Sequence, residues 1–513
     1  MTAAWAPWEG RAVKEGIGNG RAYAAIVALA AVLLVSALIA PPMVHDSFWI
    51  DFVWADQFTA ELRRGIFYPR WLPLSHDGLG SPVFYFYPPF GFYIAALFGL
   101  LGAPTYASLI LAFGAGLAGS GIAMHLWLKG WAERPLAGAC FYMIAPYHLC
   151  DFYFRGALAE FTAFIWLPLV ALGIRRAAAG RGVLLLSFAY AALILSHLPA
   201  ALLASLFLVA PYSLLAAKRA GLIKIALALA LGCGLAAVYL VPALTLQDTI
   251  SAEKLWAAPQ FRPEAWSFFH PERWIERKAV LILIYLTAAS AMAAAVMLIR
   301  RREPWAALAL LCCILITGVL PALWSLPIIE KVQFPWRALT VVEFALATAV
   351  ACSRGRPLFT IAAVSPALLA SGIALAPAHP PGPSLAFLRQ AHPDVIEYLP
   401  PGATKEVEFK YTMRATEAAR KQPPVRMDGD RSIVRTYYYP AWHVLCQGRE
   451  APSFPDPRTR LLSYRGKDCT IVWRRLDAEN IGAVISLVAL SIAAGLAMIG
   501  LPRRRMSVSA SSP

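Results

Sequence analysis

A set of polar side chains stands out in this sequence because its members lie beside long apolar segments. They are His45, Asp46, Arg70, Arg155, Glu160, His197 and Arg337. Charged or titratable groups at the depth of a membrane are costly, and they normally mark a functional site. A guanidinium group is suited to a phosphate, which it can contact through two parallel hydrogen bonds. The set therefore indicates a site for an anionic ligand next to a membrane.

Each candidate also has a purely structural interpretation. Asp46 precedes an aromatic amphipathic helix that we expect to run to Gly65, and aspartate is a favoured N-cap. Arg155 and Glu160 can form an ion pair, but an exposed pair stabilises by only about 0–1 kcal/mol, which favours contact with a ligand. Arg337 can either extend to the membrane interface or bind a phosphate. The residues alone leave these alternatives open.

The acids of the first polar segment cannot all share one site. Asp46, Asp51, Asp56 and Glu61 are spaced by five residues, which rotates successive positions by about 140° around a helix. Asp46 lies nearest the membrane and is the predicted catalytic residue. We expect Asp51 and Asp56 to solvate the helix or to hold an ion. Glu343, inside a later apolar segment, either pairs with a neighbouring helix or carries a proton.

The composition is typical of a protein that crosses a membrane several times. The chain has 513 residues, of which 59% are hydrophobic and 15% charged, with a mean hydropathy of +0.58. Soluble proteins carry about a quarter charged residues. The net charge of +16 comes from short basic clusters between apolar blocks, as expected for retained cytoplasmic loops, so binding to nucleic acid is not predicted.

These basic clusters predict the topology. Two crossings fit between most successive clusters, which gives about twelve transmembrane helices with both ends in the cytoplasm. Residues 22–40 form a retained first helix rather than a cleaved signal peptide. Residues 84–102 carry the pair Pro88-Pro89 near their start, and we expect them to form a re-entrant or juxtamembrane helix. The clusters are Lys129 and Arg134; Arg175, Arg176 and Arg181; Lys218, Arg219 and Lys224; Arg300–Arg302; Arg354 and Arg356; and Arg503–Arg505.

The region before the last apolar segment has a different character. Residues 377–478 hold short alternating stretches such as "RSIVRTYYY" and no apolar run long enough to span a membrane, which predicts a small β-rich extracytoplasmic domain. Cys446 and Cys469 lie in it, and an oxidising compartment would permit a disulfide, with two buried thiols as the alternative. The predicted domains are 1–376 with a first outer loop at 42–104, then 377–478, then a final helix and basic tail at 479–513.

Several motifs are missing from the sequence. It has no GxxxxGK[ST], no GxGxxG followed by a Rossmann pattern, no HExxH and no CxxC. The first loop also lacks a DxD pair. Nothing in the sequence therefore predicts a nucleotide fold, a zinc site or haem.

The order of several motifs resembles a known family. The motifs are "HDSF", "ELRRGIFYPRWLP", "DGLGSPVFYFYPPFGFYIAALFGLLG", "APYHLCDFYFRGALAEFTAFIWLPLV", "LSHLPAALL" and "VQFPWRAL". They are similar to bacterial polytopic membrane proteins called 6-pyruvoyl-tetrahydropterin synthase-related, which resemble the GT-C superfamily of glycosyltransferases. The resemblance covers residues 22–352 and extends loosely to "YYYPAWHVLCQGRE".

The resemblance implies an all-α GT-C-like membrane protein of the bacterial inner membrane. It would transfer a sugar, with inversion, from a polyprenyl-phosphate donor to a glycan, lipid or protein acceptor at the outer leaflet. Asp46 matches the usual first-loop base, and Arg155 with Arg337, or alternatively Arg70, would stabilise the leaving phosphate. Glu160 and His197 would contact substrate. A lone His45-Asp46 replaces the superfamily's paired acids, so a divalent metal ion is an open alternative, and no cofactor is certain.

Two other classes of function remain as alternatives. A transporter or flippase of lipid-linked sugars should show internal repeats and broken helices that place charge at mid-membrane. The sequence shows no clear repeat, and its charges favour one face. A non-catalytic membrane protein that only binds glycolipid through the outer domain is the third possibility. Glycosyl transfer is the function that we expect.

Overall fold

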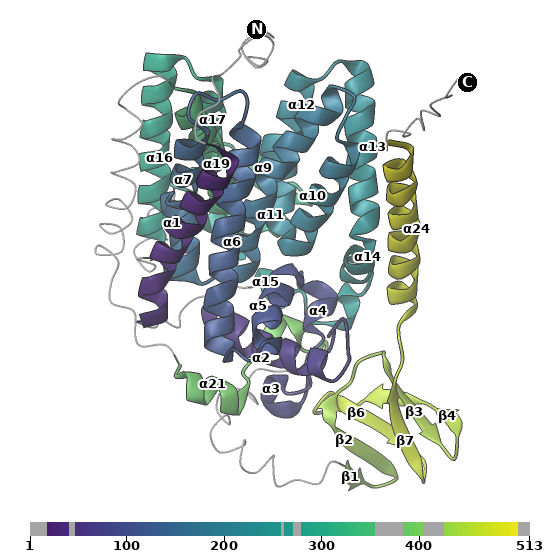
Figure 1. The fold of residues 1–513 in the computed structure, drawn as a ribbon. Helices are drawn as coiled ribbons and strands as arrows, with labels where there is room; N and C mark the ends of the chain where they lie inside the picture. Colours follow the sequence, from purple (N-terminus) through teal and green to yellow (C-terminus); the bar gives the residue numbers. More distant parts are fainter. Residues whose placement is uncertain are drawn as a thin grey trace, which may run out of the picture.

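The computed structural model shows a helical bundle with a small β domain at one end (Figure 1). Within the described residues, six helices are long and apolar enough to cross a membrane, and a seventh span is added if the bent pair α13 and α14 counts as one. The chain is therefore a multi-pass helical protein with a small β domain, as its composition predicted. The structure describes residues 18–39, 47–257, 261–269, 279–353, 383–403 and 425–500.

The long spans alternate with shorter helices. Helix α6 (Thr105–Leu128) has 24 residues and α9 (Leu158–Ala178) has 21. Helices α10 (Val183–Ser196) and α19 (Leu339–Cys352) have only 14 residues each. A helix of that length measures about 21 Å, which is shorter than the roughly 30 Å thickness of a bilayer core. With the preceding turn Pro335–Ala338, α19 nevertheless forms a candidate span of 18 residues, whereas α10 is among the shorter apolar helices.

Two other parts of the bundle are interrupted or bent. A single apolar stretch forms α11 (Leu198–Ala204), a π-helical segment (Ser205–Val209) and α12 (Ala210–Ala216), and α13 bends by 72° into α14. The other helices are α1 (Asn19–Ile39), α7 (Pro135–Met143), α8 (Pro146–Cys150), α13 (Arg219–Leu235), α14 (Ala237–Thr245), α16 (Ala279–Arg301), α17 (Pro304–Ile316) and α24 (Asp477–Gly500).

The described loops that carry basic clusters, which follow α6, α9, α12 and α16, lie at one end of the bundle (Figure 1). The Arg175 guanidinium lies 4.9 Å from the centroid of the Trp127 ring, and that ring is 5.7 Å from Trp305. The Arg134 amide donates a hydrogen bond of 3.0 Å to the Ala351 carbonyl, which joins the start of α7 to the end of α19. The polar segment after α1 and the β domain occupy the opposite end. Such a one-sided distribution of charge is typical of membrane proteins.

The polar segment after α1 is built from short helices. Helix α2 (Phe48–Arg63) is followed by α3 (Ser75–Gly78), α4 (Val83–Phe86) and α5 (Phe90–Leu100). Residues 84–102 are therefore not one helix, because the Pro88-Pro89 pair separates α4 from α5. Helix α5 has 11 residues, too few to cross a bilayer, and it packs against α2, α6 and α9.

The β domain consists of two antiparallel sheets with strand orders β1-β2-β6-β5 and β4-β3-β7. Helix α21 (Leu385–Ala391) precedes the strands in the chain and packs against α2 and α3. The strands are β1 (Val425–Asp428), β2 (Arg431–Tyr437), β3 (Trp442–Cys446), β4 (Arg449–Ala451), β5 (Ser453–Pro455), β6 (Leu461–Arg465) and β7 (Cys469–Trp473).

The expected number of about twelve crossings stays a prediction. The structure adds four shorter apolar helices to the candidate spans, and α10 and α17 are among them. Residues 354–382, which would carry a further crossing, lie outside the described residues. The predicted domain limits at 376 and 478 also stay predictions.

Candidate functional site

Four charged side chains meet in the interior of the bundle, near the start of α9. The Arg155 Nη1 donates to Asp151 Oδ1 at 2.5 Å and to Glu160 Oε2 at 2.8 Å. The Nε of Arg337 lies 3.3 Å from the same Glu160 oxygen. All four residues are buried. Two guanidinium groups thus converge on a single carboxylate.

A reversal of the chain positions Arg155 and Glu160. Asp151–Arg155 form a π-helical turn that follows α8, and Gly156 then adopts a left-handed conformation with φ of +60°. This glycine lets the chain turn into α9, which begins two residues later, so that Glu160 lies in the first turn of the new helix. Arg155 and Glu160 therefore come together across the turn.

Residues just before α19 hold both arginines in place. Pro335–Ala338 form a short 3₁₀ turn that carries Trp336 and Arg337. The Arg155 guanidinium lies over the Trp336 ring, 4.6 Å from its centroid, and Arg337 Nη1 also donates to the Val332 carbonyl at 2.9 Å. The pair Arg155 and Glu160 is buried rather than exposed, which corrects the expectation that an ion pair here would contribute little.

The hydrogen bonds of Glu343 explain how a carboxylate can be buried within α19. Its two oxygens accept hydrogen bonds from the Tyr147 amide at 2.5 Å and the His148 amide at 2.9 Å. These amides belong to the first turn of α8, where a helix leaves its N–H groups without internal partners. The Tyr147 hydroxyl in turn donates to Glu160 Oε1 at 2.5 Å. Glu343 therefore pairs with a neighbouring helix and, through Tyr147, supports the charge cluster.

Replacing Glu343 by leucine is expected to destabilise the protein, because two buried amides lose their acceptors at about 1–3 kcal/mol each. Glu343→Gln keeps one acceptor oxygen and should lie between the wild type and Glu343→Leu. Thermal unfolding of the purified protein in detergent measures both. Glu330→Leu is the control, because Glu330 is 44% exposed and pairs with Lys331 at the surface. Equal melting temperatures for the variants at 343 and 330 would contradict the capping role.

The first polar segment meets the charge cluster directly. The Ser47 amide donates to the Arg155 carbonyl at 3.0 Å, and Asp51 Oδ2 accepts from the Leu158 amide at 3.0 Å. Asp51 is fully buried and caps α9, so the expectation that it solvates α2 is wrong. Asp56 accepts a hydrogen bond from the Thr105 hydroxyl. The segment is thus anchored to the Arg155 turn.

The predicted catalytic residue, Asp46, lies outside the described residues, and so does His45. Ser47 follows Asp46 directly and occupies the N-cap position of α2, although its side chain makes no capping hydrogen bond. Consecutive Cα atoms are about 3.8 Å apart. The backbone of the residue next to Asp46 is therefore part of the contact with Arg155.

His197 forms the turn between α10 and α11. Its Nδ1 accepts a hydrogen bond from the Ala200 amide at 3.3 Å, so the imidazole caps α11. A ring nitrogen that accepts a hydrogen bond carries no proton, and an imidazole with one bare nitrogen is neutral. The side chain is therefore neutral at physiological pH, and it contributes no charge to the cluster.

Arg70 belongs to a second buried cluster. Its Nε lies 3.0 Å from Glu479 Oε2 in the first turn of α24, and its Nη2 donates to the Val238 carbonyl at 2.7 Å. The Tyr85 hydroxyl donates to the other Glu479 oxygen at 2.6 Å. These hydrogen bonds go to α14 and α24 and not to Glu160. Arg70 therefore connects the first polar segment to the last helix.

A double-mutant cycle is expected to show strong coupling between Arg70 and Glu479. Arg70→Met or Glu479→Leu alone should cost about 3–5 kcal/mol, because each leaves a buried charge without its partner, whereas the double variant should cost less than either. The coupling free energy is obtained from the thermal unfolding of the wild type, both single variants and the double variant in detergent. The exposed pair Arg465 and Asp430 is the control, with a similar separation of 3.1 Å and an expected effect of about 0–1 kcal/mol. Additive losses at 70 and 479 would show that the pair contributes nothing.

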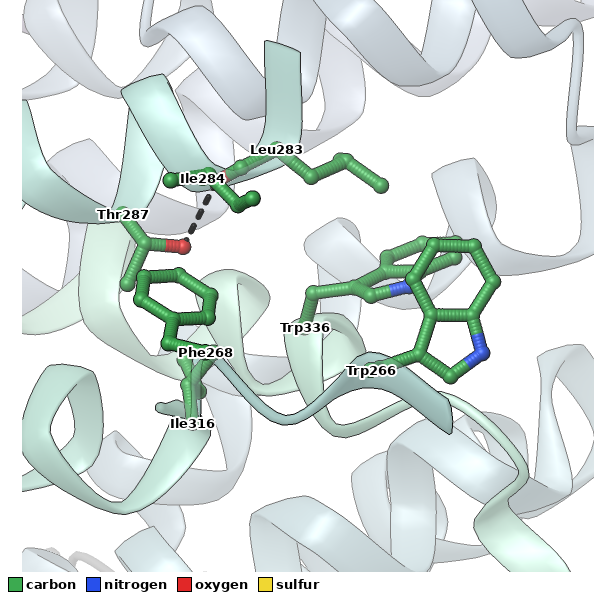
Figure 2. Close-up of a pocket in the computed structure, with 7 residues that line it drawn as sticks. All are labelled: Trp266, Phe268, Leu283, Ile284, Thr287, Ile316 and Trp336. Carbon is green, nitrogen blue, oxygen red and sulfur yellow. Dashed lines mark hydrogen bonds between the residues drawn. The ribbon is translucent and has the colours of Figure 1, made fainter. Parts of the chain in front are cut away.

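Figure 2 shows a mostly apolar pocket in the helical part of the protein. One of its walls is Trp336, the same ring over which the Arg155 guanidinium lies. The other walls come from α16, the end of α17 and the segment before α16. The lining residues are Trp266, Phe268, Leu283, Ile284, Thr287, Ile316 and Trp336. The pocket and the charge cluster therefore share the Trp336 ring.

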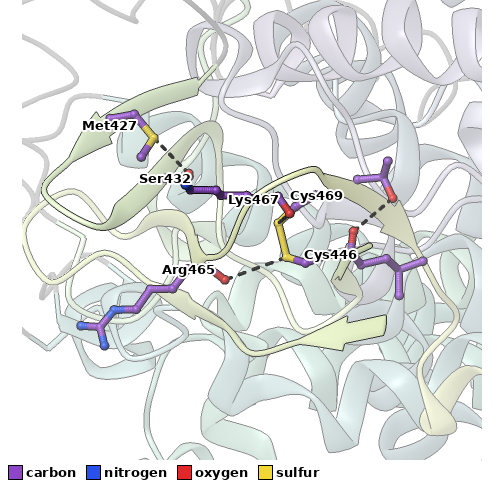
Figure 3. The surroundings of a disulfide bond; sticks show 8 residues. Met427, Ser432, Cys446, Arg465, Lys467 and Cys469 are labelled. Atoms are coloured by element: carbon purple, nitrogen blue, oxygen red, sulfur yellow. Dashed lines mark hydrogen bonds between the residues drawn. A yellow bond between two sulfur atoms is a disulfide. The ribbon is translucent and has the colours of Figure 1, made fainter. Parts of the chain in front are cut away.

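Cys446 and Cys469 form a disulfide in the structure (Figure 3). They face each other on the neighbouring strands β3 and β7. The bond therefore ties the two longer strands of the smaller sheet together. The other six cysteines are reduced in the structure.

The carboxylates of the charge cluster do not form a metal site. Among the residues that the structure describes, no group of three or more His, Cys, Asp and Glu side chains could hold a metal ion. Asp151 and Glu160 are bonded to guanidinium groups, which are cations themselves. This donor set therefore does not fit a divalent cation.

The predicted site residues did not include three members of the site, which are Tyr147, Asp151 and Trp336. A signal for Trp336 was present, because it stands next to Arg337 after a proline at the start of a helix. Asp151 and Arg155 are four residues apart, a spacing that brings side chains together on a helix. No local signal links Tyr147 to Glu160.

No protein-family model and no curated protein matches the chain. Among solved structures, the arabinofuranosyltransferase AftD from Mycobacteria, determined by cryo-EM, aligns with a TM-score of 0.45 and 18% identity. The alignment covers 74% of this chain and 29% of that chain. A mutant of AftD aligns with a TM-score of 0.46 and 18% identity, and it covers 74% and 30%. This chain thus spans less than a third of the length of these neighbours.

Proposed function

We propose that the chain is a membrane glycosyltransferase that moves a sugar from a polyprenyl-phosphate carrier to an acceptor, with inversion. The observation that carries the proposal is the convergence of Arg155 and Arg337 on one buried carboxylate beside an apolar pocket. Paired guanidinium groups are suited to a phosphate. The cluster is buried inside a bundle of apolar helices, so its substrate would come from the bilayer.

A lipid-linked phosphate fits both parts of this site. Its head would contact Arg155 and Arg337, while the first units of its chain would enter the pocket lined by α16 and α17. Three of the pocket residues belong to α16, a helix whose apolar span is only 28% buried inside the protein. The rest of that helix is free to face lipid. The pocket thus lies between a helix that can face lipid and the Trp336 ring, which contacts Arg155.

The reaction needs one base and one way to stabilise the leaving group. A hydroxyl oxygen of the acceptor attacks the anomeric carbon, and the bond from that carbon to the phosphate oxygen breaks. Asp46 takes the hydroxyl proton as general base. The electron pair of the broken bond stays on the polyprenyl phosphate, where Arg155 and Arg337 stabilise it. The attack comes from the face opposite the phosphate, which inverts the anomeric configuration.

We further propose about twelve crossings in a bacterial inner membrane, with both ends in the cytoplasm and the charge cluster at the outer leaflet. A cysteine at Phe67, which is 86% exposed after α2, should react with an impermeant maleimide in intact spheroplasts. A cysteine at Arg181, in the loop after α9, should react only after lysis. The parent protein with Cys233→Ser gives the background. The opposite pattern would invert the topology and place the site at the inner leaflet.

Broken helices favour one alternative, a transporter of lipid-linked sugars. Helix α13 bends by 72° into α14, and His197 interrupts the apolar stretch between α10 and α11. Transporters use such interruptions to bind charged groups within the membrane. Loss of a transporter would leave the lipid-linked sugar intact but on the wrong side, whereas loss of a transferase would leave it unused on the outer side.

The decisive experiment deletes the gene and compares cell-envelope glycans and lipid-linked sugars by mass spectrometry. We expect the loss of one sugar from a glycan and accumulation of its lipid-linked donor. Complementation with the wild type should restore the sugar, and Asp46→Asn should express at the same level without restoring it. Restoration by Asp46→Asn would remove Asp46 from the mechanism, and unchanged glycans after deletion would reject glycosyl transfer.

A further inference from the structure

The carboxylate of Glu160 occupies the position that a phosphate would need. Its Oε2 accepts hydrogen bonds from Arg155 at 2.8 Å and from Arg337 at 3.3 Å. Its Oε1 accepts from the Tyr147 hydroxyl at 2.5 Å. The side chain is buried. Both oxygens of Glu160 are thus held by donors, and two of these donors are the groups proposed to bind the substrate.

The four side chains of the cluster have no excess positive charge that could bind a second anion. Arg155 and Arg337 carry two positive charges, and Asp151 and Glu160 carry two negative ones. A phosphate placed beside Glu160 would repel it in a buried environment, where like charges interact strongly. The phosphate and the Glu160 carboxylate also accept from the same N–H groups. Binding of one therefore requires displacement of the other from at least one arginine.

We propose that Glu160 is a displaceable internal ligand that holds Arg155 and Arg337 in position and competes with the substrate phosphate for them. This inference rests on the proposed function, because it assumes that the two arginines bind a phosphate. The free protein then avoids a buried Arg337 without a carboxylate partner, which would be costly, while Arg155 also keeps its contact with Asp151. The return of Glu160 to the arginines favours release of the polyprenyl phosphate after transfer. The competition lowers the affinity for phosphate below the value that the two arginines alone would give.

The test measures binding of undecaprenyl phosphate to the purified full-length protein in detergent by native mass spectrometry. Glu160→Gln removes the negative charge but keeps an acceptor oxygen. We expect this variant to bind undecaprenyl phosphate roughly tenfold more tightly than the wild type, which corresponds to about 1.4 kcal/mol. Undecaprenol, which lacks the phosphate, should bind both proteins equally. A residue that only supports the fold would lose affinity on substitution, so the sign of the change separates the two roles.

Two further variants keep the test independent of the folding of Glu160→Gln. Tyr147→Phe removes the hydroxyl that holds Glu160 Oε1 and leaves every charge in place. We expect it to tighten binding of undecaprenyl phosphate less than Glu160→Gln does, because the carboxylate still competes. Glu61→Gln is the matched control, since Glu61 is also buried and pairs with Arg64, which is outside the cluster. It should leave the affinity unchanged.

The outcomes separate this inference from the proposed function. Arg337→Gln should weaken binding of undecaprenyl phosphate, and this result tests the phosphate site itself. If Arg337→Gln weakens binding but Glu160→Gln and Tyr147→Phe bind no tighter than the wild type, competition by Glu160 is wrong and the site stands. If Arg337→Gln changes nothing, the proposed phosphate site fails, and the inference fails with it.

Discussion

Replacing Arg155 by methionine is expected to lower the stability of the protein by about 3–5 kcal/mol and to abolish sugar transfer. The change leaves Asp151 and Glu160, both buried, without the guanidinium that contacts them at 2.5 and 2.8 Å. Transfer would be lost because one of the two groups that stabilise the leaving phosphate is gone. Thermal unfolding in detergent measures the first effect, and restoration of the glycan in deleted cells measures the second.

Arg474→Met is the matched control for this prediction. Arg474 contacts Glu450 at 3.2 Å, but both side chains are about half exposed, so the loss should be about 0–1 kcal/mol. Arg155→Lys adds a second comparison, since it keeps the charge and loses the planar fork. We expect it to be more stable than Arg155→Met and still impaired in transfer. If Arg155→Met melts at the temperature of Arg474→Met, the cluster does not support the fold as described.

The Gly156→Ala variant is expected to disrupt the contact between the first polar segment and the start of α9. Gly156 has a φ of +60°, and an added Cβ would lie 2.5 Å from the Phe48 Cβ and 3.1 Å from the Phe48 Cα. A left-handed residue with a side chain costs about 1–2 kcal/mol, and overpacking adds about 1–3 kcal/mol. The melting temperature should fall clearly, and transfer should fall with it, because Asp46 precedes Phe48 by only two positions in the sequence.

Gly65→Ala isolates the backbone part of this effect. Gly65 also has a positive φ, of +86°, but nothing lies within 4 Å of the position of an added Cβ. The free energy of unfolding of this variant should fall only by the conformational cost of about 1–2 kcal/mol, and sugar transfer should be kept. Equal losses for the two variants would show that Phe48 moves away easily. The contact with Gly156 would then not position the first polar segment.

The general architecture could be read from the sequence because it depends on composition along the chain. Apolar blocks of about 20 residues and basic clusters between them indicate membrane helices without any tertiary information. The helix expected to run to Gly65 ends at Arg63, since Gly65 adopts the positive φ that stops a helix there. Alternating residues indicated the β domain in the same way. These signals depend only on residues that are close together in the chain, so they could be recognised without knowing the tertiary contacts.

The partners of the site residues could not be read from the sequence because they are distant in the chain. Arg337 and Glu160 are separated by 177 residues, and Asp51 caps a helix that begins 107 residues later. Arg155, Glu160 and Arg337 could be identified as candidates because charged residues beside apolar segments are costly and normally mark a functional site. Whether a pair is buried depends on neighbours from other helices, so the expectation of an exposed pair at Arg155 had no basis in local spacing.

The contact between Tyr85 and Glu479 has a consequence for biosynthesis. The two residues are separated by 394 positions, so the early polar segment emerges long before its partner is translated. Arg70 therefore lacks its Glu479 counter-ion until residue 479 has been translated. We expect a nascent chain that stops before residue 479 to expose an uncompensated guanidinium at the membrane. Such products are natural targets for membrane proteases, and shortened forms of the protein should be degraded rather than inserted.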